Sequence, residues 1–129
     1  MAENYDEVYR ASQANPSAFW GEAANLAHWY KAPSTILDDA NPPFLQWFPD
    51  GETNACYNAL DRHVADGRGE QDALIYDSPV TGTKRRFSYR ELLERVSIFA
   101  GALRAEGIAK GDRVIIYMPM VPEDAIAML

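Results

Sequence analysis

Residues 85–118, RRFSYRELLERVSIFAGALRAEGIAKGDRVIIYM, contain the pattern that decides the fold. Ser88 and Glu91 have the spacing of a capping box, in which two side chains satisfy open backbone N–H groups at a helix start. Apolar residues then recur at helical spacing. Within a predicted strand over Arg113–Met118, the residues Val114–Tyr117 are apolar without alternation, as expected for a strand covered on both faces. A short strand over Arg85–Phe87, the helix and this second strand predict a βαβ crossover, and hence a parallel sheet.

The stretch Met118–Pro122 follows the predicted second strand. Ligands of open α/β sheets bind outside the carboxyl ends of the strands, so this stretch is a candidate border of a ligand site. The alternative is a turn stiffened by proline and packed in the interior. Glu123 and Asp124 come next and fit the start of a further helix. Two strands and one crossover do not close a doubly wound domain, and we expect the domain to be incomplete at Leu129.

The residues before the crossover predict a helix and a hairpin. Asn54 is a candidate cap for a helix over residues 55–64, which glycines at 67 and 69 would end. Ala73–Tyr76 is a predicted short strand, and Asp77–Lys84 a turn that leads into Arg85–Phe87.

The first part of the chain is predicted to be helical and then irregular. Asn4 is a candidate cap for a helix over Tyr5–Gln13, and Asn15-Pro16 begins a predicted helix over Pro16–Trp29. Four prolines exclude a long helix over Lys31–Glu52. This segment also contains many large apolar side chains, and we expect it to pack on another surface.

Composition limits the function classes. The chain has 129 residues, 47% hydrophobic and 24% charged, and a formal net charge of -7. An acidic chain disfavours a nucleic-acid surface, and we expect no binding of duplex DNA at moderate salt. No window has the length and apolar character of a membrane span. The N-terminus is acidic and lacks an apolar run, so we expect a cytoplasmic protein with no membrane partner.

Candidate chemical residues each have a plain structural interpretation beside the functional one. Cys56 is the single cysteine, which excludes an internal disulfide, and the two histidines lack the spacing of metal ligands. The glycine-poor turn at 81–84 lacks the spacing of a P-loop. The other candidates are a glycine pair, two arginines, the two histidines, several carboxylates and one capping serine: Gly67, Gly69, Arg85, Arg86, His28, His63, Asp38, Asp39, Asp61, Glu22, Glu91, Glu94 and Ser88. No residue is assigned a catalytic, cofactor-binding or metal-binding role.

A series of motifs resembles the N-terminal region of short-chain acyl-CoA synthetases. They are, in order, Phe19-Trp20 with Trp29-Tyr30, Asn41-Pro42-Pro43 with Trp47-Phe48, NACYNALDRH at 54–63, ALIYDSPVT at 73–81, Tyr89 with Glu91-Leu92, and KGDRVIIYMPM at 110–120. Within that family, IYDSPVTGT at 75–83 resembles propionyl-CoA synthetases more than acetyl-CoA synthetases.

This resemblance implies an α/β fold of the adenylate-forming superfamily. Residues 1–65 would be a helical and loop-rich N-terminal extension, and residues 66–129 the start of the large parallel-sheet, AMP-binding domain. The family joins a carboxylate to ATP as an acyl-adenylate, releasing pyrophosphate, and coenzyme A then displaces AMP to give the thioester. Magnesium would screen the phosphates.

The family's functional motifs are the phosphate loop, the ribose aspartate, the phosphate arginine and the C-terminal lysine. None has a match in residues 1–129. We therefore expect this chain alone to be inactive and to bind no ATP, coenzyme A or Mg²⁺. Its expected partner is the remainder of its own polypeptide, and the parent enzyme's substrate is a small carboxylate.

Two hypotheses follow. The chain is either the N-terminal piece of an AMP-forming propionate- or acetate-CoA ligase, or a stand-alone, non-catalytic interaction module derived from the same fold. The sequence that follows Leu129 separates them.

Overall fold

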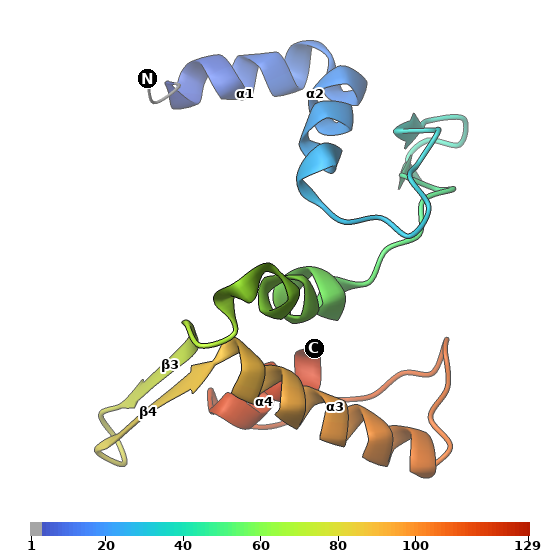
Figure 1. Ribbon diagram of the computed structural model, residues 1–129. Helices are drawn as coiled ribbons and strands as arrows, with labels where there is room; N and C mark the ends of the chain where they lie inside the picture. The colour runs from blue at the N-terminus through green and yellow to red at the C-terminus, as the bar shows by residue number, and fades with distance from the viewer. Residues whose placement is uncertain (1–3) are drawn as a thin grey trace. The chain divides into compact units, whose positions relative to one another are not determined.

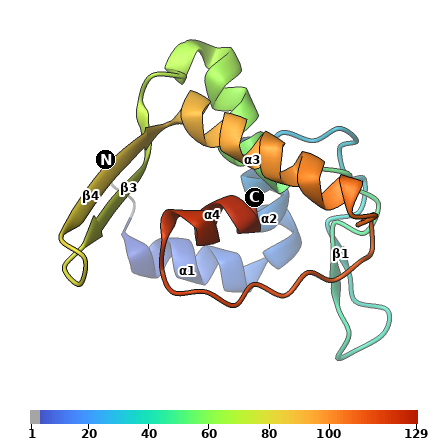
Figure 2. The ribbon, with the colours of Figure 1, turned by 90° about the horizontal axis from the view of Figure 1, so that it is seen from below.

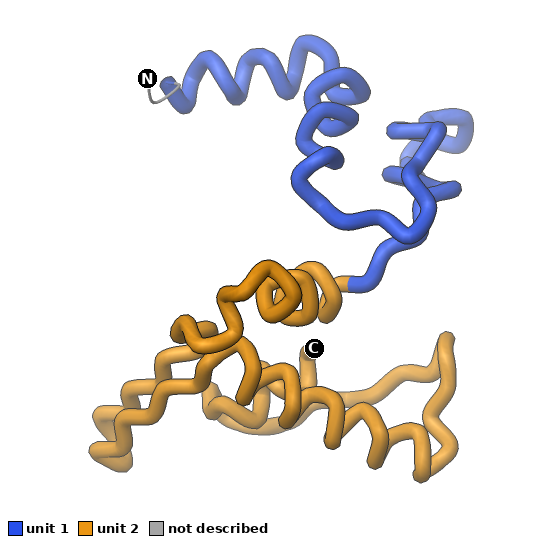
Figure 3. Tube along the Cα trace, viewed as in Figure 1, with its two compact units in different colours: residues 1–54 blue, residues 55–129 orange. Residues whose placement is uncertain are grey.

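The chain folds as two compact units in a computed structural model that describes residues 4–129. The first unit ends at Asn54 and the second spans Ala55–Leu129 (Figure 3). From the sequence we place a domain boundary between residues 65 and 66, and that domain boundary stays a prediction.

Two capped helices open the first unit. Helix α1 spans Tyr5–Ala14, and the Asn4 side chain accepts a hydrogen bond from the backbone N–H of Asp6. Helix α2 spans Pro16–Ala23, and the Asn15 side chain accepts from the backbone N–H of Ala18 at 3.0 Å. Both caps confirm the sequence expectation.

The second of these helices is shorter than predicted. A 3₁₀ turn, η1, covers Ala24–Leu26, and the backbone is extended at Ala27. The prediction of one helix to Trp29 was therefore wrong at its C-terminal end. The Trp29 indole N–H donates to the Ala24 carbonyl oxygen at 2.8 Å. This hydrogen bond links the extended backbone after η1 to the C-terminal end of α2.

The remainder of the first unit is irregular, as predicted, but it is closed by local pairing. Strand β1, Leu37–Asp38, pairs antiparallel with β2, Gln46–Trp47, and a single bridge joins Lys31 to Glu52. The Asp50 carboxylate accepts hydrogen bonds from Ser34 and Thr35, which links the two ends of this loop. These hydrogen bonds hold the pKa of Asp50 well below its usual range, the Ser34 hydroxyl having the largest effect.

The second unit begins with a helical segment that contains wide turns. Helical backbone runs from Ala55 to Arg68 and includes π-helical turns η2, Tyr57–Asp61, and η3, Val64–Arg68. Gly67 has φ 81°, a left-handed conformation that glycine adopts without steric cost, and it interrupts the helical geometry near the predicted end.

A hairpin and a long helix follow. Strand β3, Asp72–Ser78, pairs antiparallel with β4, Thr83–Ser88, which confirms the predicted hairpin (Figure 1). Helix α3 spans Tyr89–Ala105 and has the predicted capping box. The backbone N–H of Glu91 donates to Ser88 Oγ at 3.2 Å, and the backbone N–H of Ser88 donates to Glu91 Oε2 at 2.9 Å.

Replacing Ser88 by alanine removes half of this capping box. We expect Ser88→Ala to lower the free energy of unfolding of the second unit by about 1 kcal/mol, because a backbone N–H at the helix start loses its acceptor. Ser97→Ala, at an exposed site within the same helix, is the matched control and should stabilise slightly through helix propensity. Urea titration followed by circular dichroism measures both. Equal effects of the two substitutions would contradict the capping role.

The predicted strand over residues 113–118 is not a paired strand in this structure. The segment is extended, but neither of the two-stranded sheets among the described residues includes it. Ile115 and Tyr117 are 89% and 98% exposed. The prediction of a strand covered on both faces was therefore wrong for this chain, because the segment has no neighbouring strand here. It returns along the unit to helix α4, Pro122–Met128, which packs against α3 (Figure 2).

The buried core is small relative to the number of apolar residues in the chain. Among residues 4–129, four hydrophobic side chains are buried, all in the second unit: Leu60, Phe87, Leu92 and Val96. The accessible surface is 10064 Å², whereas surface scaling gives about 6,800 Å² for one folded body of this mass and about 8,200 Å² for two separate bodies. Much apolar surface is therefore exposed. No helix of the described residues is long and apolar enough to span a membrane.

Candidate functional site

The stretch Met118–Pro122, predicted to border a ligand site or to be a packed turn, adjoins a small hollow. The hollow has a volume of about 190 Å³ and lies between β3 and the start of α4. Its lining includes Leu74, Tyr76, Met120 and Pro122, with Asp124 as the one charged group. Pro122 is buried, as expected for a packed turn, while Met120 is 90% exposed. The hollow offers apolar contact rather than an acid–base pair.

The basic turn at 81–86 has the properties of a solvated hairpin. Each of its cations faces a carboxylate: Lys84 lies 2.7 Å from Asp77, Arg85 lies 3.8 Å from Glu123, and Arg86 pairs with Asp72. All three pairs are substantially exposed to solvent. These neighbours already balance the positive charge that a phosphate grip would need, and the glycine-rich spacing is absent.

A cluster around His63 was not foreseen from the sequence. The Arg68 guanidinium contacts His63 Nδ1 and lies 5.9 Å from the centre of the Tyr89 ring. The His63 and Tyr89 rings meet edge to face, with centroids 4.9 Å apart. Desolvation lowers the pKa of His63, and the neighbouring Arg68 and Arg62 charges lower it further, whereas Asp66 opposes them. The imidazole is thereby held neutral and packs against the start of α3.

This arrangement predicts a pH dependence of stability. Because the pKa of His63 is lower in the folded state than in the unfolded state, the unfolded chain binds more protons as the pH falls below about 6.5. The stabilisation by neutral His63 is fully present above that pH and is lost progressively below it. His63→Gln should flatten the dependence between about pH 7 and 5, and Arg68→Gln should weaken it. Urea titrations at several pH values test this; an unchanged slope in His63→Gln would contradict it.

The remaining candidate residues have local structural roles. Cys56 Sγ donates to Asp61 Oδ2 at 3.8 Å, and burial raises the pKa of the thiol, which makes it a poor nucleophile. Asp38 accepts from the backbone N–H of Ala40. Ser88 and Glu91 form the helix cap, and Glu94 lies on an exposed face of α3. His28 belongs to the first unit and contacts the Tyr30 ring edge to face.

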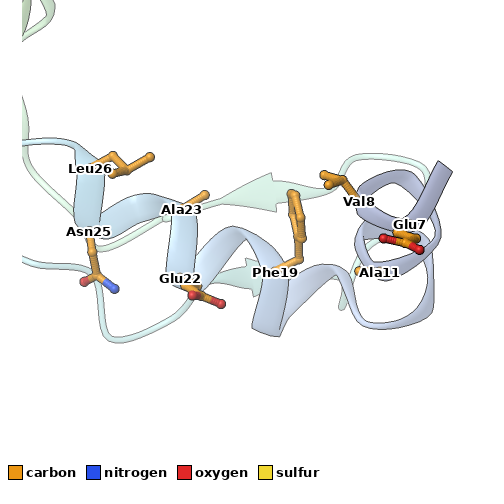
Figure 4. A pocket seen from close by; sticks show the side chains of 8 residues that line it. All are labelled: Glu7, Val8, Ala11, Phe19, Glu22, Ala23, Asn25 and Leu26. Carbon is orange, nitrogen blue, oxygen red and sulfur yellow. The ribbon is translucent and has the colours of Figure 1, made fainter. Parts of the chain in front are cut away.

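A second concavity lies within the first unit, between α1 and α2. This groove has a volume of about 700 Å³. Figure 4 shows Phe19, Ala23 and Leu26 pointing to one side of α2 and η1, with Val8 opposite on α1. Glu7, Glu22 and Asn25 form its polar rim, and the small apolar residue Ala11 also lines it. The helical spacing of the apolar residues was visible in the sequence, but the angle between the two helices was not.

Neither concavity has the donor set of a metal or nucleotide site. Among residues 4–129, no group of three or more His, Cys, Asp or Glu side chains is placed to hold a metal ion. The described residues thus offer no preformed carboxylate cluster for magnesium.

Family models match almost the whole chain. Residues 61–129 match the AMP-binding enzyme model, and residues 5–59 match the model of the acetyl-coenzyme A synthetase N-terminus. The chain belongs to the AMP-binding enzyme family, and within it corresponds to the N-terminal segment of a short-chain acyl-CoA synthetase. The resemblance noted in the sequence and the expected fold class, an incomplete adenylate-forming domain, are confirmed.

Individual relatives agree with this assignment. The chain is 56% identical over 125 residues to an uncharacterized protein of Pseudomonas aeruginosa, covering 97% of this chain and 20% of that protein. It is 50% identical to the mitochondrial acyl-CoA synthetase short-chain family member 3 of Rattus norvegicus, covering 97% of this chain and 18% of the relative. The acetyl-coenzyme A synthetase of Cupriavidus metallidurans is 46% identical, and the match covers 98% of this chain and 19% of that protein.

A solved structure extends the match to the fold. The acetoacetyl-CoA synthetase from Streptomyces lividans superposes with a TM-score of 0.83 at 30% identity, covering 99% of this chain and 20% of that one. The chain therefore spans about a fifth of the length of the relatives it matches.

Proposed function

We propose that this chain is the N-terminal part of an AMP-forming acyl-CoA synthetase that acts on propionate or acetate. The carboxylate would attack the α-phosphate of ATP to give an acyl-adenylate and pyrophosphate, and the thiol of coenzyme A would then displace AMP. The observation that carries the proposal is the order of two family models along one chain, together with fold similarity over 99% of it.

Within this proposal, residues 4–129 supply structure rather than chemistry. The extended segment over residues 113–118 would gain strand neighbours from the remainder of the polypeptide, and the apolar groups of residues 31–52 would be covered by it. The excess of accessible surface over that of a compact body supports such a partner. We infer that residues 1–129 alone are inactive.

The test is exchange of labelled pyrophosphate into ATP by the complete polypeptide. We expect exchange that depends on propionate or acetate, and none by residues 1–129 alone. The sequence motif at 75–83 favours propionate. Equal or faster exchange with octanoate would contradict the short-chain assignment.

The alternative is a stand-alone interaction module with the same ancestry. It predicts a stop codon directly after Leu129 and a monodisperse, cooperatively unfolding 129-residue protein. The exposure of Ile115, Tyr117 and Met120 favours the synthetase, because an independent domain rarely leaves so much contiguous apolar surface in water.

A further inference from the structure

The groove between α1 and α2 combines an apolar floor with an acidic rim. Val8, Phe19 and Leu26 provide the apolar contact surface, and Glu7 and Glu22 lie on the rim (Figure 4). Both carboxylates are exposed, and neither takes part in an ion pair within residues 4–129. Leu26 is 79% exposed. A ligand in the groove would therefore meet apolar surface and uncompensated negative charge together.

Charge is distributed unevenly between the two units. Residues 1–54 contain eight acidic and two basic residues, whereas residues 55–129 contain eleven acidic and ten basic residues. The two basic residues of the first unit, Arg10 and Lys31, do not line the groove. The acidic excess thus belongs to the unit with the groove, and it favours an occupant of positive charge.

The lining of the groove comes from two helices and a turn, α1, α2 and η1, and a helical segment is one occupant that such a groove can take. An amphipathic helix places apolar side chains at intervals of three and four residues into such grooves and leaves its flanking polar side chains at the rim. Lysine or arginine at those flanking positions would complement Glu7 and Glu22.

We propose that this groove docks a cationic amphipathic segment of a partner protein. Apolar side chains on one face of the segment contact Val8, Phe19 and Leu26. Basic side chains beside that face meet the two rim carboxylates. The proposal concerns a surface of the first unit and does not depend on the reaction that the complete enzyme catalyses.

The test uses the complete polypeptide and a labelled 14-residue peptide of leucine and lysine in a helical pattern, with binding followed by fluorescence anisotropy. We expect saturable binding that weakens as the salt concentration rises. The double variant Glu7→Gln/Glu22→Gln should bind about fivefold more weakly, and Leu26→Gln about tenfold more weakly. The matched control, Asp39→Asn/Glu52→Gln, removes the same charge from the same unit outside the groove and should change binding by less than about twofold.

Three outcomes would overturn the proposal. The first is no binding to the complete polypeptide, which would mean that the groove is covered by its own chain. The second is equal binding of a peptide of the same composition with its leucines and lysines scrambled, which would show general charge attraction. The third is equal weakening in the control variant. Pyrophosphate exchange by the same protein samples is measured separately, so that failure of docking and failure of the proposed function are distinguishable.

Discussion

Phe87→Ala is expected to lower the free energy of unfolding of the second unit by about 3–5 kcal/mol. Phe87 is 4% exposed, and among residues 4–129 it shares the buried core with three other hydrophobic side chains, Leu60, Leu92 and Val96. The ring also lies beneath two guanidinium groups, with Arg85 Cζ at 4.7 Å and Arg95 Cζ at 5.2 Å from its centre. Alanine would leave a cavity that so small a core cannot refill.

Hydrogen exchange measured by mass spectrometry on residues 72–105 tests this prediction. Amides that exchange only through unfolding of the unit should exchange at least about a hundredfold faster in Phe87→Ala. Phe87→Leu is the matched control, since it keeps most of the apolar volume and removes the ring that the two arginines contact. Phe87→Leu should lower the free energy of unfolding by about 1–2 kcal/mol. If both variants accelerate exchange equally, the cations rather than the packing stabilise this core.

Local signals in the sequence predicted the helix ends and the hairpin well. Asn4, Asn15 and Ser88 each accept the backbone hydrogen bond that their position suggested, because capping depends on residues within one turn. The hairpin of β3 and β4 is similarly local, since a short turn fixes its strands. These features need no information from distant parts of the chain.

Features that depend on distant residues were missed or wrong. The stretch at 113–118 has the composition of a covered strand, but pairing requires neighbours that residues 4–129 do not provide. The helix after Pro16 ends early, and the Trp29 indole bonds back to the Ala24 carbonyl oxygen, a contact that helical periodicity does not reveal. The closing of the 31–52 loop by Asp50, sixteen residues from Ser34, has no local signature either.

The same limit applies to the candidate site. The proline-containing stretch Met118–Pro122, predicted to border a ligand site or to be a packed turn, lines a hollow that is largely apolar, and its role as a ligand site stays a prediction. His63 was interpreted as structural, and its contact with Tyr89 has that character. The groove between α1 and α2 was not predicted, because it arises from the angle between two helices and not from either one.

Trp29→Ala is expected to destabilise the first unit by about 3 kcal/mol. No side chain of that unit among residues 4–54 is fully buried, so ring contacts between half-exposed aromatics replace a core. Trp29 is central to them. Its ring lies 5.3 Å from that of Phe48 and packs so closely on Gly51 that an added Cβ there would come within 2.7 Å of the indole. Removing the indole also removes one of the two hydrogen bonds that the Ala24 carbonyl oxygen accepts, the other coming from the Ala27 backbone N–H at 3.1 Å.

Urea titration followed by the fluorescence of Trp20 and Trp47 measures this effect, because all three tryptophans lie in the first unit. Trp29→Phe keeps an aromatic ring and removes only the indole donor, and should cost about 1 kcal/mol. Trp20→Ala is the matched control for loss of an indole: Trp20 is 45% exposed and meets the Phe19 and Trp47 rings edge to face, so we expect the free energy of unfolding to fall by about 1 kcal/mol or less. If Trp29→Ala and Trp20→Ala unfold at the same urea concentration, the closure of residues 31–52 depends on the Asp50 hydrogen bonds and not on the indole. The ranking of the three variants thus separates aromatic packing from hydrogen bonding as the cause of order in a unit that has no buried core.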